Sequence, residues 1–141
     1  MTIAFDAATE STAWTTIPDP QLIVHTPTGT PTWALLLIGQ AVGATDDIDG
    51  TPTYGGVSMP RVMSVGMTTG EPGRVYAFFT NNPPSGLQTV SIPHTASANT
   101  KIATIITGTG TGQVVSNGQA SSAESASTFA QSKQIRTGSA A

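Results

Sequence analysis

Apolar and polar side chains alternate over much of this chain, and Gly or Pro interrupts the alternation about every ten residues. The pattern is clearest between Tyr54 and Ile92. Side chains two positions apart point to the same face of a strand, so a period of two indicates β-strands with one face in a core. Ser58, Ser64 and Gly66 occupy the polar phase. We therefore expect a core face made of Val57, Met59, Met63, Val65 and Met67.

Further strands follow from the same pattern. Trp33–Val42 is short and apolar in both phases, which predicts a central strand buried on both faces. Gln21–Thr26 is expected to form a strand with Leu22 and Val24 on one face. The other extended candidates are residues 2–6, residues 11–17, Arg74–Thr80, Gln88–Ile92, Ile102–Thr107 and Gln113–Ser116.

Turn residues predict how some of these strands connect. The sequence NNPPSG lies between Arg74–Thr80 and Gln88–Ile92, and we expect it to join them as a hairpin. Gly55-Gly56 predicts left-handed backbone angles or a bulge. Pro60 before Arg61 predicts an edge strand or a bulge. Proline has no amide hydrogen, and at these two places no ladder hydrogen bond depends on one.

The composition changes after residue 118. Gln119–Thr137 contains neither Gly nor Pro and is dominated by Ser, Ala and Gln. Ser121 and Glu124 have the spacing of a helix-capping box, so a short helix is one interpretation. We favour an extended arm, because only Phe129 and Ile135 would anchor the segment. The sequence thus predicts an all-β, antiparallel β-sandwich of immunoglobulin-like or jelly-roll-like type at residues 1–118, followed by a Ser/Ala-rich C-terminal arm at 119–141.

Composition supports a single β-domain and excludes several classes of function. The 141 residues suffice for one domain with two packed layers. Only 9% of the residues are charged, while Thr and Ser make up about a quarter of the chain. A net charge of −3 argues against a phosphate-neutralising nucleic-acid surface. Without cysteine there is no disulfide or thiolate site. We expect no signal peptide and no membrane span, because the longest apolar run falls short of about 20 residues.

No residue cluster predicts a catalytic, cofactor-binding or metal site. Asp46, Asp47 and Asp49 lack the spacing and the distal Glu of a calcium loop, so we interpret them as a solvated acidic turn. Gly108–Gly112 lacks the Lys-Ser/Thr of a phosphate loop and is expected to be a flexible turn. His25 and His94 have no nucleophile elbow to join. The remaining acids are too scattered for a carboxylate pair: Asp6, Glu10, Asp19, Glu71 and Glu124.

Aromatic and methionine side chains leave two interpretations open. Exposed aromatics on a β-sandwich can stack on sugar rings, but strand aromatics are more often core. A glycan-binding module would need one or two of Trp14, Trp33 and Tyr54 to be exposed. Met59, Met63 and Met67 are equally suited to core filling and to an adaptable contact surface. The other aromatics considered are Tyr76, Phe78 and Phe79.

Three motifs also carry a family resemblance. They are Tyr54-Gly-Gly-Val-Ser-Met59, Gly70-Glu-Pro-Gly-Arg-Val-Tyr76 and Pro84-Ser-Gly-Leu-Gln-Thr-Val90, and Trp33–Gly43 fits the buried strand that precedes them. In these residues, about half of the chain, the sequence resembles a family of small β-sandwich proteins encoded by tailed bacteriophages and prophages. Similar proteins often continue with further strands where this chain has its Ser/Ala-rich segment, which predicts a sheet edge left open for a neighbouring chain.

The resemblance implies a virion structural protein without an active site, placed on the tail, its tip or fibres, or as a decoration on the capsid. It would be made in the host cytoplasm and end up in the virion. We accordingly expect a non-enzymatic protein without cofactors, a homo-oligomer or a docking protein, whose partners are other virion proteins and copies of itself. The alternative is a carbohydrate-binding or receptor-binding module of a phage tail that contacts a host-surface glycan. A cell-surface hydrolase is a third class, and the sequence offers no acid/base pair for it.

Overall fold

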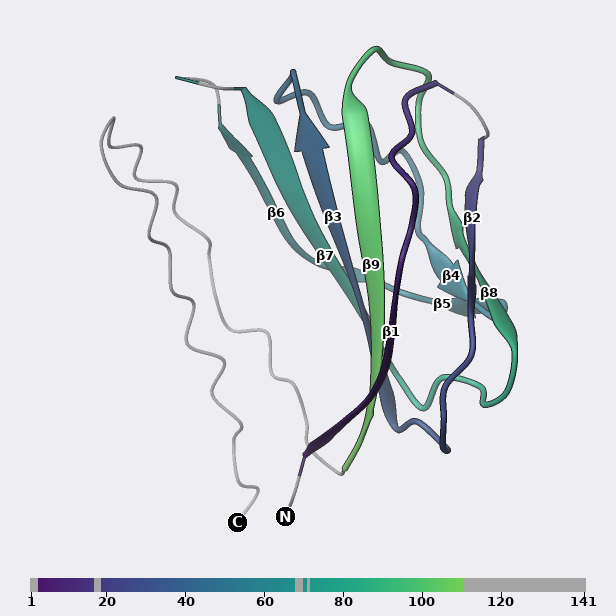
Figure 1. Ribbon diagram of the computed structural model, residues 1–141. Coiled ribbons are helices and arrows are strands. Elements are labelled where there is room, and N and C mark those ends of the chain that lie inside the picture. The colour runs from purple at the N-terminus through teal and green to yellow at the C-terminus, as the bar shows by residue number, and fades with distance from the viewer. Residues whose placement is uncertain (1–2, 17–18, 68–69, 71, 111–141) are drawn as a thin grey trace.

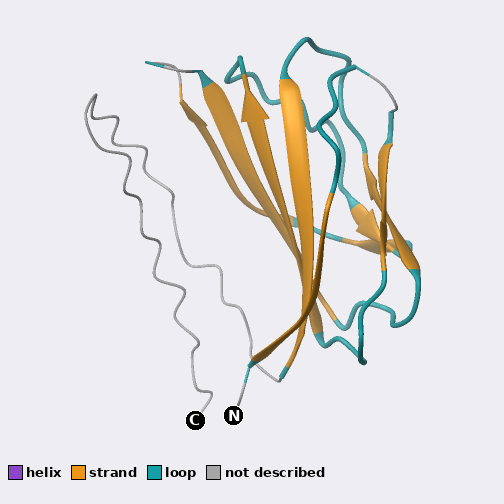
Figure 2. Cartoon of the chain, in the orientation of Figure 1, coloured by secondary structure: helices purple, strands orange, loops and turns teal. Residues whose placement is uncertain are grey.

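Two antiparallel sheets packed face to face form the fold in the computed structural model (Figure 1). The structure describes residues 3–16, 19–67, 70 and 72–110, and the statements below concern these residues. They contain strands, turns and loops but no helix (Figure 2). The predicted all-β antiparallel sandwich is therefore confirmed. The predicted arm at 119–141 and the strand at 113–116 lie outside the described residues.

The larger sheet has five strands in the order β1-β9-β3-β7-β6, and the smaller has four in the order β2-β8-β4-β5. The strands of the larger sheet are β1 (Ala4–Glu10), β9 (Thr100–Thr109), β3 (Trp33–Ala41), β7 (Gly73–Asn81) and β6 (Arg61–Met67). Those of the smaller sheet are β2 (Gln21–His25), β8 (Gln88–Ile92), β4 (Thr53–Tyr54) and β5 (Val57–Ser58). Gly55 and Gly56, both at positive φ, make the two-residue turn between β4 and β5, as the sequence predicts.

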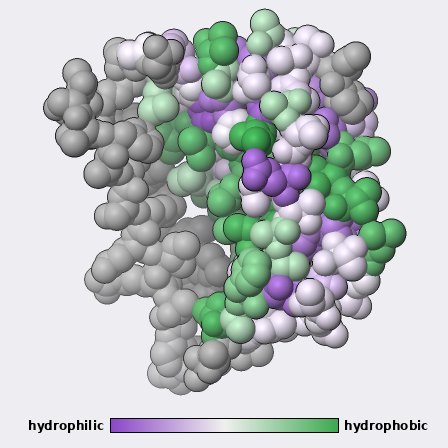
Figure 3. Space-filling model, in the orientation of Figure 1, coloured by the Kyte–Doolittle hydropathy of each residue, from purple (hydrophilic) through white to green (hydrophobic). Residues whose placement is uncertain are grey.

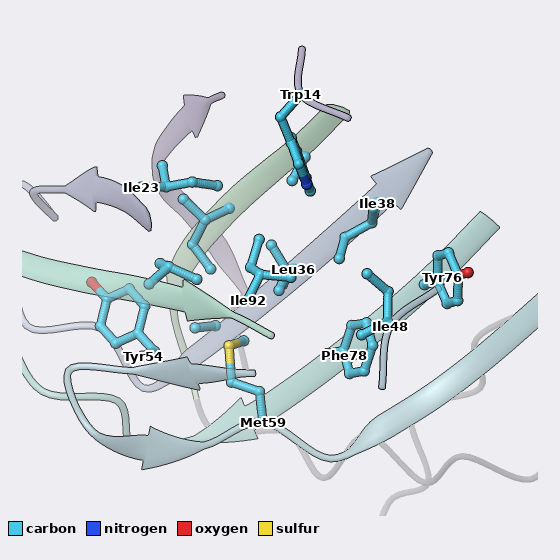
Figure 4. Packing of buried hydrophobic residues seen from close by; sticks show 14 residues of the cluster. Trp14, Ile23, Leu36, Ile38, Ile48, Tyr54, Met59, Tyr76, Phe78 and Ile92 are labelled. Carbon is cyan, nitrogen blue, oxygen red and sulfur yellow. The ribbon is translucent and has the colours of Figure 1, made fainter. Parts of the chain in front are cut away.

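The hydrophobic core lies between the two sheets (Figure 4). Leu36 and Ile38 of β3 point into it and are fully buried. They meet Ile92 of β8, Met59 from the segment before β6, and the ring of Phe78 on β7 (Figure 4). Each fully buried side chain of this size contributes about 1.5–3 kcal/mol of transfer free energy. The core also contains Trp14, Ile23, Ala34, Ile48, Tyr54, Tyr76, Val90, Ala103 and Ile105.

Strand β3 is the central strand of the larger sheet, as its two-sided apolar pattern predicts. It pairs along its whole length with β7 on one side and β9 on the other. Only one of its faces points to the second sheet. Leu36 and Ile38 are completely buried, whereas Leu35 and Leu37 on the opposite face are only half-buried. The expectation of burial on both faces is therefore wrong for the described residues.

The predicted core face is wrong for β6. Ser64 pairs with Tyr76, a core residue, and so points inwards, whereas Val65 pairs with Val75 on the opposite face. Of the five predicted core residues only Met59 is fully buried, and Val57 is 38% exposed. A register shift between Arg61 and Met63 breaks the alternation between the two segments. This is the predicted bulge, and one extra residue inverts the faces of the strand that follows.

The predicted hairpin between the strands at 74–80 and 88–92 is also wrong. Strand β7 pairs with β3 and β6, whereas β8 pairs with β2 and β4 in the other sheet. The NNPPSG segment between them crosses from one sheet to the other. It contains Asn82 at positive φ and the consecutive prolines Pro83 and Pro84, which suit a change of direction better than a tight ladder.

Two smaller expectations are corrected as well, and a third is confirmed. Residues 11–16 form no strand, although Trp14 makes an isolated antiparallel pair with Lys101. Leu22 and Val24 share a face as predicted, and that face is exposed to solvent. Gly108 belongs to β9 and not to a turn. A Cβ atom at Gly108 would overlap the indole ring of Trp33, which explains why glycine occupies this strand position.

The different environments of two methionines test the inverted face of β6. We expect Met59→Ala to lower the free energy of unfolding by about 2–5 kcal/mol, because it opens a cavity in the core. Met63→Ala, on the outer face of an edge strand, should cost about 1 kcal/mol or less. Urea unfolding followed by tryptophan fluorescence measures both values. Equal costs would mean that Met63 lies in the core and that the register is different.

Candidate functional site

The acidic segment at 46–49 is divided between surface and interior. Asp46 is on the surface and forms an ion pair with Arg61. Asp47 is buried, and its Oδ2 lies 3.2 Å from Nζ of Lys101, which is itself completely buried. Ile48 belongs to the core and Asp49 is exposed. The interpretation as a solvated acidic turn is therefore wrong for Asp47.

The ammonium group of Lys101 and Oδ2 of Asp47 each have several hydrogen-bond partners. The ammonium group donates to Oγ of Ser97 at 3.0 Å and to the backbone carbonyl of Asn99 at 3.1 Å, in addition to the carboxylate. Asp47 Oδ2 also accepts from Ser97 Oγ and from Asn99 Nδ2. Burial alone would raise the pKa of Asp47, but the hydrogen bonds from Ser97, Asn99 and Lys101 hold that pKa below its ordinary 3.8. All three ammonium hydrogens have acceptors, so the pair is a closed structural unit.

The backbone of the same loop is fixed to the larger sheet. The hydroxyl of Tyr76 accepts from the Asp47 amide at 3.0 Å and donates to Oε1 of Gln40 at 3.0 Å. Nε2 of Gln40 donates to two loop carbonyls, and Nε of Arg74 donates to the Ala44 carbonyl at 2.8 Å. Burial raises the pKa of Tyr76 to about 12, so the phenol stays protonated and can donate. In the described ranges, no three His, Asp or Glu side chains come together to hold a metal ion.

Removal of one partner tests whether the ion pair stabilises the fold. We expect Lys101→Met to lower the free energy of unfolding by about 3–5 kcal/mol, since it leaves the Asp47 carboxylate buried and unpaired. The double variant Asp47→Asn/Lys101→Met should cost less than the sum of the two single variants. Asp46→Asn, next in sequence but exposed, is the matched control and should cost about 1 kcal/mol or less. Additive costs for Asp47 and Lys101 in urea unfolding would contradict the pairing.

A second polar cluster surrounds His25 between β1, β2 and β9. His25 Nδ1 accepts from Oγ1 of Thr9 at 2.8 Å, and Nε2 lies 3.1 Å from Oγ1 of Thr107. The Thr107 hydroxyl lies 3.1 Å from Oδ2 of Asp6, and Oδ1 of Asp6 accepts from Thr28. A hydroxyl has one proton, which Thr107 donates to Asp6; we therefore assign the neutral tautomer of His25 that carries its proton on Nε2.

Burial disfavours the charged form of this histidine. It lowers the pKa of His25, and the negative charge of Asp6 opposes the shift only in part. The Thr28 hydrogen bond, with help from Thr107, lowers the pKa of Asp6 despite its desolvation. A hydroxyl, an imidazole and a carboxylate thus form one chain, the groups of a nucleophilic site. Here Thr107 separates the ring from the acid and His25 is buried, so the chain of hydrogen bonds links β1, β2 and β9.

The neutral state of His25 predicts a pH dependence of stability. A base whose pKa is lowered in the folded state stabilises the fold fully above its unfolded pKa of 6.5 and progressively less below it. We expect the free energy of unfolding to fall between about pH 7 and about pH 5, by at most about 1.4 kcal/mol per pH unit for one proton. The slope should be smaller in His25→Gln, measured by urea unfolding at each pH. An unchanged slope in this variant would contradict the assignment.

His94 and most of the aromatic candidates lie in the interior. The His94 ring is completely buried at 6.1 Å from the ring of Trp14, and its backbone amide donates to Asp19 Oδ1. Trp14 and Tyr54 are core residues, so neither meets the expectation of an exposed sugar-stacking ring. Trp33 is half-buried on the outer face of β3. Burial raises the pKa of the Tyr54 phenol to about 12.

Sequence analysis missed the outer face of the five-stranded sheet as a possible site. Cross-strand pairing puts one row of Val65, Val75, Gly39 and Ile102 on this face. Val75 and Ile102 are 37% and 41% exposed. Adjacent rows hold Met63, Ala77, Leu37 and Thr104, then Phe79, Leu35, Ile106 and Ala8, and then Asn81, Trp33, Gly108 and Phe5. The second apolar phase of Trp33–Val42 was the signal that could have revealed it.

Hydrophobic residues reach the surface on the side of the molecule where β3, β7 and β6 lie (Figures 1 and 3). Within the described ranges, no helix has the length and hydropathy that a bilayer crossing needs. No family model matches this chain, and no curated protein or solved structure is significantly similar to it. The arrangement of its own residues therefore carries the functional argument.

Proposed function

We propose that this chain is a non-enzymatic structural protein of a bacteriophage virion, a minor tail or fibre component or a capsid decoration protein, which acts through subunit contacts. The observation that supports this proposal is where the described polar and apolar side chains lie. Lys101, Asp47 and His25 are buried and bonded within the sandwich, and Asp6 is linked to His25 through Thr107 at the edge of the larger sheet. Large apolar side chains meanwhile reach the surface. Such a molecule offers contact area, with shape and apolar burial as its means of binding.

The positive charges support the same proposal. The basic side chains of the described residues are Arg61, Arg74 and Lys101. Lys101 is buried with Asp47, and Arg61 binds Asp46 and lies over the rings of Tyr76 and Phe78. Arg74 donates to the Ala44 carbonyl and to Ser64 Oγ. In this part of the chain the cations hold the fold together, which disfavours nucleic-acid phosphate as a partner.

The motifs that resemble the phage family are the reason for proposing a phage particle as the assembly. In this proposal the sandwich is the rigid part of each subunit, and the loops and the C-terminal arm at 119–141 hold neighbouring subunits. The sequence of the arm contains few large apolar residues, so in this proposal it acts through its contacts with neighbouring subunits. The glycan-binding alternative has less support, because Trp14 and Tyr54 are both in the core.

Purified particles test the proposed role. Particles of a phage that encodes this chain are banded on a density gradient, and the chain is sought by quantitative mass spectrometry in intact particles, isolated tails and empty shells. We expect it at a fixed copy number in one of these fractions. Its absence from every particle fraction, with the protein present in the lysate, would overturn the proposal.

Limited proteolysis tests the role of the arm by comparing its cleavage in free and assembled protein. Equal cleavage at 119–141 in the two states would contradict an assembly role for the arm.

A further inference from the structure

The outer face of the five-stranded sheet, defined by the four cross-strand rows given above, is uncharged over four adjacent strands. On β9, β3, β7 and β6, every charged residue sits at a position that pairs with the core side: Lys101 and Arg74 with Gln40, and Arg61 with Phe78. Glu10 on the edge strand β1 is the charged residue at its margin. This surface has no charge that would attract a charged partner. Covering it with another uncharged surface removes no charged group from water.

The edges of this sheet are poor sites for association. β1 and β6 are its two edge strands, and each carries a register irregularity, between Phe5 and Ala7 in β1 and between Arg61 and Met63 in β6. A bulge interrupts the row of free amides and carbonyls that a neighbouring strand would need. The face, and not the edge, is therefore the part of this sheet suited to a partner.

The centre of this face combines large side chains with one glycine. Leu35 and Leu37 form a ridge along β3, and Gly39 next to them leaves a hollow flanked by Val75 and Ile102. A Cβ atom at Gly39 would lie 3.8 Å from Ile102 Cγ2, an ordinary van der Waals contact, so the backbone would tolerate a side chain there and the hollow exists only because glycine has none. A two-fold axis that lies between the two copies, perpendicular to β3 and level with Ile38, would place Leu37 of one copy over Gly39 of the other. Two sheets pack face to face at about 10 Å in this manner.

We propose that a second copy of this chain docks on this outer face, so that two five-stranded sheets pack against each other about a two-fold axis. The inference rests on the proposed function, because it names the partner of the subunit contact. Five strands about 4.8 Å apart, each adding about seven residues, project roughly 550 Å². Two such faces together cover about 1,100 Å², which is close to the ~1,000 Å² that a specific interface needs. Residues 111–141 are the other possible occupant, and their large apolar side chains are only Val114, Val115, Phe129 and Ile135.

The mass of the full chain in solution, measured by light scattering over a concentration series, tests this inference. We expect a dimer that dissociates on dilution. Val75→Asp and Ile102→Asp replace side chains already exposed in the single chain, and each should weaken dimerisation at least ~100-fold, because the symmetry buries two carboxylates. Gly39→Val fills the hollow without adding charge and should also weaken it. The matched control is Val24→Asp, 59% exposed on the other sheet, which should leave the mass unchanged.

Each outcome decides between occupants. A wild-type monomer at every concentration, or equal dissociation by Val24→Asp, overturns the inference. Dimers that survive Val75→Asp and Gly39→Val but dissociate in Phe129→Ser/Ile135→Ser would make the C-terminal arm the contact instead. Near-native circular dichroism in each variant separates lost contact from lost fold. The particle fractionation is independent: a dimer lost only in the face variants, with no protein in particles, would retain this contact and remove the virion role.

Discussion

The structure depends on the pleat of β3, which places alternate side chains on opposite sides of one central strand. Leu36 and Ile38 fix the strand to the core, while Leu35 and Leu37 form the middle of the outer face. Because β3 is bonded to β7 and β9 along its whole length, the same ladder that aligns the core also aligns the outer rows. The core and the proposed contact surface are therefore held by one register, and a slip of one residue would exchange them.

The scarcity of charge has a structural consequence. With 9% charged residues, the chain has few groups to keep its surface in water, and it buries Lys101 and Asp47 in the interior. A buried ion pair adds little net stability over a well-packed apolar pair, but it strongly disfavours arrangements that separate its members. Asp47 lies in the loop after β3 and Lys101 lies at the start of β9, so the pair fixes that loop against the adjacent strand. The two charges of this pair therefore favour one arrangement of the loop and the strand, and they do not contribute to the polarity of the surface.

Period and turn chemistry were enough to predict the fold class, the central position of β3, the Gly55-Gly56 turn and the bulge after Pro60. They did not predict which sheet each strand joins, because β7 and β8 are adjacent in sequence but belong to different sheets. Nor can a period of two tell which phase faces the core. A single bulged residue reversed the faces of β6, and the apolar phase of Met63, Val65 and Met67 became the outer one. Buried pairs such as Lys101 with Asp47 join residues far apart in sequence and leave no local signal.

The motif glycines show why the family resemblance describes a fold better than a role. Gly55 and Gly56 have the positive φ of a tight turn, and a Cβ atom at Gly73 would lie 2.7 Å from the carbonyl oxygen of Gln40 on β3. The backbone of this sandwich favours glycine at these positions whatever the protein does. A role must come from positions that the backbone leaves free, and the outer face is such a place. A two-fold contact there closes on itself and gives a pair, not a filament. In the proposed virion role, attachment to a larger particle would need a second surface, and Leu22 and Val24 on the far sheet are exposed.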